Sequence, residues 1–274
     1  MTDLPTAAPA HGTPRVAVIG GSGFYEFLDD PTTVTVETPY GEPSAPIAIG
    51  DVGGRPVAFL PRHGAGHRYP PTQIPYRANL WALRSLGVER ILAPCAVGGL
   101  QPETQPGTLV VPDQLVDRTT RRVQTFVETG AAHAPFADPY CPDLRGALTT
   151  AAGEGAIDGG TMVVIEGPRF STRAESQSYA AAGWTVVNMT GHPEAVLARE
   201  LGVCYATIAL VTDLDAGVES GEAVTHAEVL RVFRDNTARL RSLLLDVAAA
   251  LPASQDGCPC ASALDGLSPD PALP

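Results

Sequence analysis

The sequence has few basic residues. Its 274 residues include 18 Lys and Arg against 30 Asp and Glu, which gives a formal net charge of −12. This shortage argues against a nucleic-acid or membrane partner, because non-specific binding to nucleic acid or to anionic membranes depends on Lys and Arg. A small anionic ligand is not excluded, since a few backbone N–H groups and one Arg can outweigh distant surface charge.

Cysteine is also scarce, and its count is odd. The five cysteines are Cys95, Cys141, Cys204, Cys258 and Cys260. Cys95 and Cys204 lie in apolar runs, where a cysteine is usually a small core residue. Cys258 and Cys260 could form a metal or redox pair, but no second pair of ligands lies near them in the sequence. We therefore predict no metal site.

The sequence lacks a run of about 18 apolar residues and any pattern typical of a secretory signal, so we expect a cytoplasmic protein. It also lacks internal repeats and a linker between two cores. With 44% apolar residues it can form one large core. We predict one domain over residues 14–252, preceded by a disordered arm at 1–13 and followed by a Pro/Ala-rich tail at 253–274 without periodicity.

Strand-like and helix-like segments alternate along this domain. We expect strands at 15–19, 91–94, 109–115, 162–166, 184–189 and 203–211, hairpin strands within 34–61, and helices at 75–86, 142–152, 171–181, 193–201 and 224–251. This alternation predicts an α/β fold.

Polar residues follow the two apolar runs at 184–189 and 203–211. Thr190 comes after the first run, and Asp213 and Asp215 come after the second. In open α/β sheets, ligands bind beyond the carboxyl ends of the strands. We therefore predict one pocket that offers a hydroxyl, the N–H groups of a helix N-terminus and two carboxylates.

Three other strand ends suit an anion. Gly20-Gly21-Ser22-Gly23 allows close backbone approach, and because the third Gly of the dinucleotide fingerprint is missing, we favour an inorganic anion with Ser22 as a donor. Arg62 and His63 follow the last of the hairpin strands within 34–61, and the guanidinium of Arg suits phosphate. Small residues at 95–99 permit a similar approach. From these residues alone, a plain glycine turn and a surface loop with unrelated charges stay open.

Six motifs occur in an order that resembles one protein family. They are Gly20-Gly21-Ser22-Gly23, Pro61-Arg62-His63-Gly64, Gln105-Pro106-Gly107 with Asp113-Gln114 and Asp117-Arg118-Thr119-Thr120, Glu166-Gly167-Pro168-Arg169-Phe170-Ser171, Asn188-Met189-Thr190 with Pro193-Glu194, and Thr212-Asp213-Leu214-Asp215. Over residues 15–251 the chain resembles the trimeric purine nucleoside phosphorylase family, in its 5′-methylthioadenosine phosphorylase branch.

The resemblance implies a single α/β domain with a central mixed, partly barrel-like sheet flanked by helices, assembled as a homotrimer. It implies cleavage of a purine nucleoside by inorganic phosphate, which is a co-substrate, with no cofactor. The phosphate-binding residues would be Ser22, Arg62, His63, Cys95, Ala96 and Thr190. Cys95 stands where this branch usually has Thr, so its backbone would serve. The nucleoside-binding residues would be His133, Phe170, Ser171, Met189, Asp213, Asp215 and His226, with the two Asp residues as catalytic groups and His133 contributed by a neighbour's loop at 131–142.

The resemblance gives a mixed indication of the substrate. Asp213 and Ser171 stand where relatives specific for 6-oxopurines carry Asn and Glu, which favours a 6-aminopurine. His226 stands where methylthioadenosine enzymes have a small apolar residue and where 6-oxopurine relatives use His for the 5′-hydroxyl. Gly191 and His192 also depart from the Thr-Val pair that usually follows the Met-Thr pair in this family. We expect 5′-methylthioadenosine, with adenosine or a 6-oxopurine nucleoside (inosine or methylthioinosine) as alternatives.

Two other classes of function stay open at this stage. One is a catalytically idle nucleoside-binding protein on the same fold, since fold does not determine activity. The other is a dinucleotide-dependent dehydrogenase, which rests on the glycine loop alone. Release of a free base that depends on phosphate would separate the expected enzyme from both.

Overall fold

A computed structural model describes residues 12–130, 132–216, 226–252 and 254–265, without the side chains of residues 226–230. One mixed sheet joins eleven strands in these ranges. They are β1 (Val16–Gly20), β2 (Thr32–Val34), β3 (Ile47–Val52), β4 (Arg55–Pro61), β5 (Arg90–Gly99), β6 (Leu109–Val111), β7 (Gln114–Arg118), β8 (Ala156–Asp158), β9 (Thr161–Ile165), β10 (Val186–Asn188) and β11 (Cys204–Leu214). The prediction of a large mixed sheet is confirmed.

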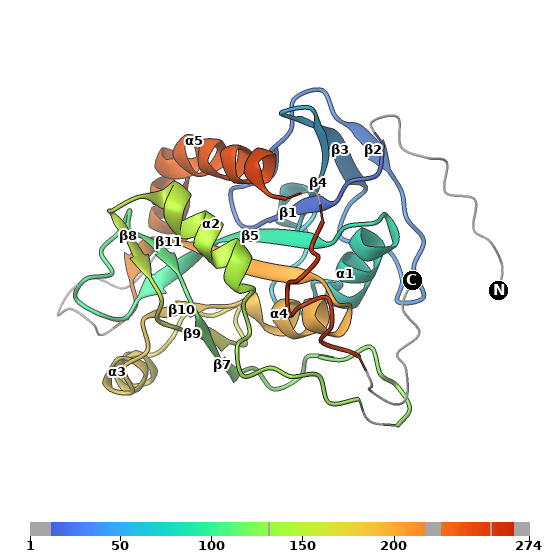
Figure 1. Cartoon of the computed structure of the whole chain (residues 1–274). Helices are drawn as coiled ribbons and strands as arrows, with labels where there is room; N and C mark the ends of the chain where they lie inside the picture. The colour runs from blue at the N-terminus through green and yellow to red at the C-terminus, as the bar shows by residue number, and fades with distance from the viewer. Residues whose placement is uncertain (1–11, 131, 217–225, 253, 266–274) are drawn as a thin grey trace.

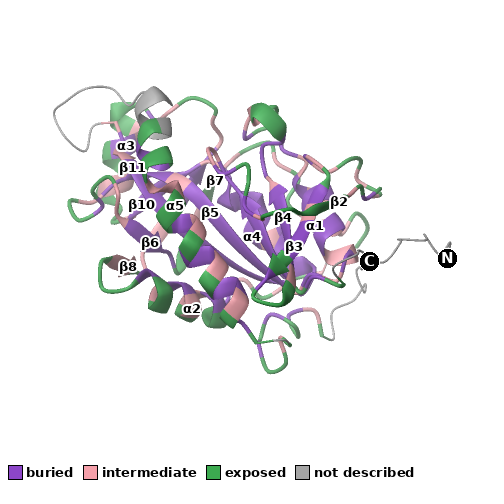
Figure 2. Cartoon of the chain, turned by 90° about the horizontal axis from the view of Figure 1, so that it is seen from above, coloured by how far each residue is buried: buried purple, intermediate pink, exposed green. Residues whose placement is uncertain are grey.

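Helices cover both faces of the sheet (Figure 1). They are α1 (Tyr76–Ser85), α2 (Pro142–Ala152), α3 (Arg173–Ala181), α4 (Gly191–Glu200) and α5 (His226–Ala250), with a short 3₁₀ turn at Ala65–His67. Apolar residues of α2 and α5 pack into one core, and those of α1 and α4 pack into a second core on the opposite face. The central strands β1, β5, β10 and β11 are almost wholly buried, whereas β2 and β7 are partly exposed (Figure 2). None of the helices in the described ranges has both the length and the apolar character needed to cross a membrane.

The sheet branches at β5. Residues 90–92 of β5 pair in parallel with β1, and Gly98 and Gly99 pair antiparallel with β10. On its other edge, β5 pairs in parallel with β11 from Arg90 to Gly99. The sheet therefore opens between the end of β1 and the end of β10, while β5 continues past both. Several strand ends meet at this opening.

Residues 95–99 lie within a strand, whereas the sequence pattern placed them after one. Their small side chains suggest a loop, but β11 supplies backbone hydrogen bonds along their whole length. The expected strand at 109–115 divides into β6 and β7, which pair with different partners. β8 has only three residues and no alternation of its own, and the sequence did not predict it.

The segment 254–265 has neither helix nor strand, yet it packs on the domain. Cys258 and Cys260 are buried, and Arg90 donates from Nη2 to the carbonyl of Ser254. This packing places the two cysteines beside Cys141 and Cys204. The second pair of thiols that is absent nearby in the sequence is therefore present in space.

Candidate active site

A cavity of about 340 Å³ lies at the opening of the sheet. Predicted site residues that line it are Ser22, Arg62, His63, Cys95, Ala96, Phe170, Ser171, Met189, Thr190, Asp213 and Asp215. They come from the ends of β1, β4, β9, β10 and β11 and from the second half of β5. His133 is exposed and does not line the cavity. His226 is the first residue of α5, and its side chain lies outside the described part.

The loop after β1 closes one end of the cavity. A Cβ atom on Gly21 would stand 3.0 Å from Arg62 Nη1 and 3.1 Å from the carbonyl oxygen of Pro94. A larger residue would therefore displace the guanidinium or the backbone of β5. Glycine at this position lets the loop and Ser22 approach the same space as Arg62.

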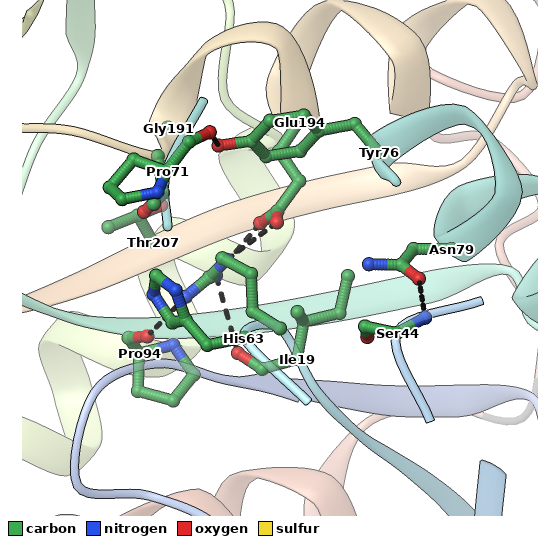
Figure 3. A network of polar contacts seen from close by, with 12 residues as sticks. Ile19, Ser44, His63, Pro71, Tyr76, Asn79, Pro94, Gly191, Glu194 and Thr207 are labelled. Atoms are coloured by element: carbon green, nitrogen blue, oxygen red, sulfur yellow. Dashed lines mark hydrogen bonds and ion pairs between the residues drawn. The ribbon is translucent and has the colours of Figure 1, made fainter. Parts of the chain in front are cut away.

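Arg62 is held by a carboxylate that sequence reasoning did not pair with it. Glu194 (labelled in Figure 3), in the first turn of α4, accepts from Arg62 Nε at 2.6 Å and from Nη2 at 2.8 Å. Tyr205 donates its hydroxyl to Glu194 at 2.9 Å. Arg62 and Glu194 are almost inaccessible to solvent, at 1% and 0% exposed. Burial lowers the pKa of Arg62, but Glu194 outweighs it and the pKa is raised overall. Arg62 is therefore charged, and with Glu194 it forms a neutral pair.

His63 is a neutral residue in this cavity. Its Nδ1 lies 2.8 Å from the carbonyl oxygen of Tyr69, and a carbonyl can only accept, so Nδ1 carries the proton. Burial lowers the pKa of His63 to about 3, and Arg62 contributes in the same direction. The ring stacks on His67 at a centroid distance of 4.1 Å. Nε2 of His63 is consequently a hydrogen-bond acceptor at neutral pH.

The start of α4 leaves the hydroxyl of Thr190 uncommitted to capping. Asn188 Oδ1 accepts from the backbone N–H groups of Thr190 and Gly191 at 2.7 and 2.6 Å, so Asn188 satisfies these donors. Thr190 makes no side-chain cap, and its Oγ1 donates only a long hydrogen bond of 3.4 Å to Asn188 Oδ1. Asn188 also donates to the carbonyl of Ala96 at 3.3 Å, which links the ends of β10 and β5.

The two carboxylates occupy the other end of the cavity. Burial raises the pKa of Asp213 to about 6, and the negative charge of Asp215 adds to this shift. Thr212 Oγ1 donates to Asp213 Oδ2 at 2.8 Å and partly opposes it. Burial also raises the pKa of Asp215, which is 3% exposed. Neither residue is therefore a solvated loop carboxylate.

Unpaired polar atoms surround Asp215. The hydroxyls of Ser171 and Ser176 lie near enough to Asp215 to moderate its raised pKa, although neither has hydrogen-bond geometry with its Oδ2. In the described part of the chain, Asp215 Oδ2 and Ser171 Oγ are buried without a hydrogen-bond partner. Buried polar atoms usually have partners, so these two atoms fit a ligand that supplies them.

A β-bulge sets the direction of the Asp213 side chain. Val211 pairs with Val97, and Asp213 pairs with the next residue, Gly98, so Thr212 is extra in the ladder. Without this bulge, Asp213 would point to the same face of the sheet as Val211, because side chains alternate along a strand. Gly98 provides the space: a Cβ atom there would stand 3.3 Å from Asp213 Oδ1.

Comparison with known proteins agrees with this geometry. The sequence matches the Phosphorylase superfamily over residues 15–249. It is 59% identical over 273 residues to a purine nucleoside phosphorylase of Streptomyces coelicolor, covering 95% of this chain and 98% of that protein. It is 62% identical over 230 residues to an S-methyl-5'-thioadenosine phosphorylase of Mycobacterium tuberculosis, covering 84% and 86%.

Solved structures are similar as well. A methylthioadenosine phosphorylase from an antarctic soil metagenomic library superposes with a TM-score of 0.84 at 42% identity, covering 93% of this chain and 92% of that one. The methylthioadenosine phosphorylase of Schistosoma mansoni in complex with adenine gives 0.83 at 40% identity, covering 86% and 91%. The chain belongs to the phosphorylase superfamily and is an enzyme of the purine nucleoside phosphorylase type. This match argues against the dinucleotide-dependent dehydrogenase.

Proposed function

We propose that this enzyme cleaves 5′-methylthioadenosine with inorganic phosphate and releases adenine and 5-methylthioribose 1-phosphate. The observation that supports it most is the half-buried carboxyl of Asp213, whose pKa is raised to about 6, in the same cavity as Ser171. A carboxyl can accept from the 6-amino group of adenine and, when protonated, donate to N7. Two relatives with this activity in their names are 62% and 60% identical to this chain over 230 and 237 residues.

In the proposed reaction, the bond between C1′ of the ribose and N9 of the purine breaks, and its electron pair stays with the purine. A phosphate oxygen forms the new bond to C1′. Asp213 donates its proton to N7 as negative charge develops on the departing base. The charge of Asp215 favours the protonated form of Asp213 before the reaction.

We assign phosphate to the opposite end of the cavity. Ser22, Arg62 and Thr190 would donate hydrogen bonds to it, together with backbone N–H groups at Cys95 and Ala96. Because Glu194 already neutralises Arg62, these donors would bind phosphate largely through hydrogen bonds and not through net charge. Met189 and Phe170 would contact the ribose and the base. No further cofactor is needed for this chemistry.

A second substrate class has specific support. The Streptomyces coelicolor relative is named a purine nucleoside phosphorylase, and a relative of Pyrococcus furiosus, 46% identical over 265 residues, is named a 6-oxopurine nucleoside phosphorylase. His226 would be suited to a 5′-hydroxyl. Adenosine, inosine and methylthioinosine are therefore the substrates against which 5′-methylthioadenosine must be compared.

Measuring kcat/KM for these four nucleosides with one enzyme preparation tests the proposal. We expect the highest value for 5′-methylthioadenosine and base release that stops when phosphate is omitted. A higher kcat/KM for adenosine than for 5′-methylthioadenosine would contradict the assignment of the 5′ substituent. A higher kcat/KM for inosine would contradict the assignment of the base. Undiminished release without phosphate would contradict phosphorolysis itself.

We also propose a homotrimer in which the loop at 131–142 closes the cavity of a neighbouring subunit, with His133 near its 5′ end. The exposure of His133, and its absence from its own cavity, fit this role. Light scattering combined with activity at decreasing protein concentration tests it. A fully active monomer would contradict the proposal.

A further inference from the structure

Four of the five cysteines form one buried cluster. The Sγ atoms of Cys141, Cys204, Cys258 and Cys260 all lie within 4.8 Å of one another. Cys258 Sγ lies 3.5 Å from Cys141 Sγ and 3.4 Å from Cys204 Sγ. All four are free thiols. Cys204 begins β11, whereas Asp213 lies near the other end of that strand, so the cluster and the cavity lie at opposite ends of β11.

These distances match those of a tetrahedral metal site. Four thiolates at about 2.3 Å from one Zn²⁺ stand about 3.8 Å from each other. The Sγ–Sγ distances from Cys258, 3.5 and 3.4 Å, are slightly shorter than this value, and all four sulfur atoms lie within 4.8 Å of one another. Cys258 and Cys260 are separated by one residue, which is a shorter spacing than in most zinc motifs, but the other two ligands come from distant elements. The structure therefore provides four ligands of one chemical type.

The backbone around the cluster fixes three of these thiols. Cys141 immediately precedes α2, and its N–H donates to the carbonyl of Tyr205, the residue after Cys204, at 2.8 Å. Cys258 donates its backbone N–H to the carbonyl of Gln255 at 3.0 Å. Gln255 in turn donates from Nε2 to the carbonyl of Gly202 at 3.1 Å. These hydrogen bonds hold the segment 254–265 beside the start of β11.

Hydrogen-bond donors and positive charge lie beside the cluster. The backbone N–H groups of Leu144 and Cys260 donate to the sulfur atoms of Cys141 and Cys258. The guanidinium of Arg199 lies near Cys260, and the positive end of the α2 dipole faces Cys141. These groups would offset part of the charge of −2 that one Zn²⁺ with four thiolates carries.

We propose that Cys141, Cys204, Cys258 and Cys260 bind one Zn²⁺ in a structural site that fastens the C-terminal segment to β11 and α2. Binding converts four thiols into thiolates, releases four protons and involves no change of oxidation state. With four protein ligands the ion has no open position for a substrate, so the site is not catalytic.

The first test uses the unmodified full-length protein. After purification without chelator, elemental analysis should find about one zinc per chain. Removing the metal under reducing conditions and adding Co²⁺ should produce the intense visible absorption of tetrahedral thiolate coordination. The metal-free protein should melt at least about 5 °C lower, and Zn²⁺ but not Mg²⁺ should restore the melting temperature.

The second test uses matched variants. Cys260→Ser should lose the stoichiometric zinc and the Co²⁺ spectrum, whereas Cys95→Ser, which changes the cysteine outside the cluster, should keep both. Two results would overturn the proposal. One is wild-type protein without zinc that gives no thiolate spectrum with Co²⁺. The other is an unreduced intact mass lower by the hydrogens of one or two disulfides within the cluster.

Discussion

Glu194 accepts hydrogen bonds from Nε and Nη2 of Arg62 at 2.6 and 2.8 Å, in a position that solvent does not reach. The pair leaves part of the guanidinium directed to the cavity, where Nη1 adjoins Gly21. We therefore expect Glu194 to be a positioning residue for the proposed phosphate site. Its role depends on the geometry of Arg62 and not on contact with a substrate.

Glu194→Gln should destabilise the protein strongly. The substitution leaves a buried guanidinium without its counter-charge, which costs about 3–5 kcal/mol. Urea unfolding at a fixed protein concentration measures the loss. Glu128→Gln is the matched control, because Glu128 pairs with Arg77 at 2.8 Å but is 68% exposed, and we expect at most about 1 kcal/mol there. Equal losses in the two variants would show that the Arg62 pair has no special role.

Thr190→Val should weaken phosphate binding without unfolding α4. Asn188 caps the helix, so the hydroxyl of Thr190 is available to a ligand. We expect the KM for phosphate to rise about tenfold, since one hydrogen bond contributes about 1.5 kcal/mol, with little change in the KM for the nucleoside. Thr190→Ser keeps the hydroxyl and should behave like the wild type.

Asn188→Ala provides the complementary measurement. It removes the cap and should lower stability by about 1 kcal/mol or more. If Thr190→Val lost stability while both KM values stayed the same, Thr190 would be a structural residue.

Asp213→Asn should lower kcat/KM for 6-amino nucleosides more than about 100-fold, because the amide mismatches the donor and acceptor of adenine and cannot donate a proton as an acid. On 6-oxo nucleosides it should lose less, or gain, since an amide NH₂ can donate towards both O6 and N7. Steady-state kinetics on the four nucleosides measures this. An Asn variant that kept the adenine preference and rate would move the role to Asp215.

The same substitution should change how stability depends on pH. The pKa of Asp213 is raised from 3.8 to about 6, so the folded protein binds a proton more tightly than the unfolded chain does. This contribution is fully present below about pH 4 and is lost as the pH rises to about 6. The melting temperature of Asp213→Asn should therefore rise relative to the wild type across this window and stay higher above it. A difference that does not vary with pH would contradict the raised pKa.

The sequence allowed the elements to be predicted where the signal is local. The helix at 142–152 has Pro at its start and Gly after its end, and the structure confirms both bounds. The motifs also identified most of the residues that line the cavity. The prediction was wrong for residues 95–99. Their small side chains are typical of a loop, but pairing with β11 keeps them in strand β5.

The features that escaped prediction depend on partners distant in sequence. Arg62 and Glu194 are 132 positions apart, and no periodicity links them. The bulge at Thr212 arises from pairing with β5 and leaves no mark in the apolar pattern of β11. The four-cysteine cluster combines three segments of the chain. The spacing of Cys258 and Cys260 alone therefore could not indicate the other two thiols.

The hydrogen bond from His63 to the carbonyl of Tyr69 has a consequence for selectivity among anions. With Nδ1 protonated, Nε2 presents a lone pair, and an oxygen atom placed against it must bring its own hydrogen. Hydrogen phosphate carries such a hydrogen at neutral pH. Sulfate has the same shape and a similar charge but no hydrogen, so its oxygen would meet another acceptor, and the cavity would discriminate between the two anions by a single proton.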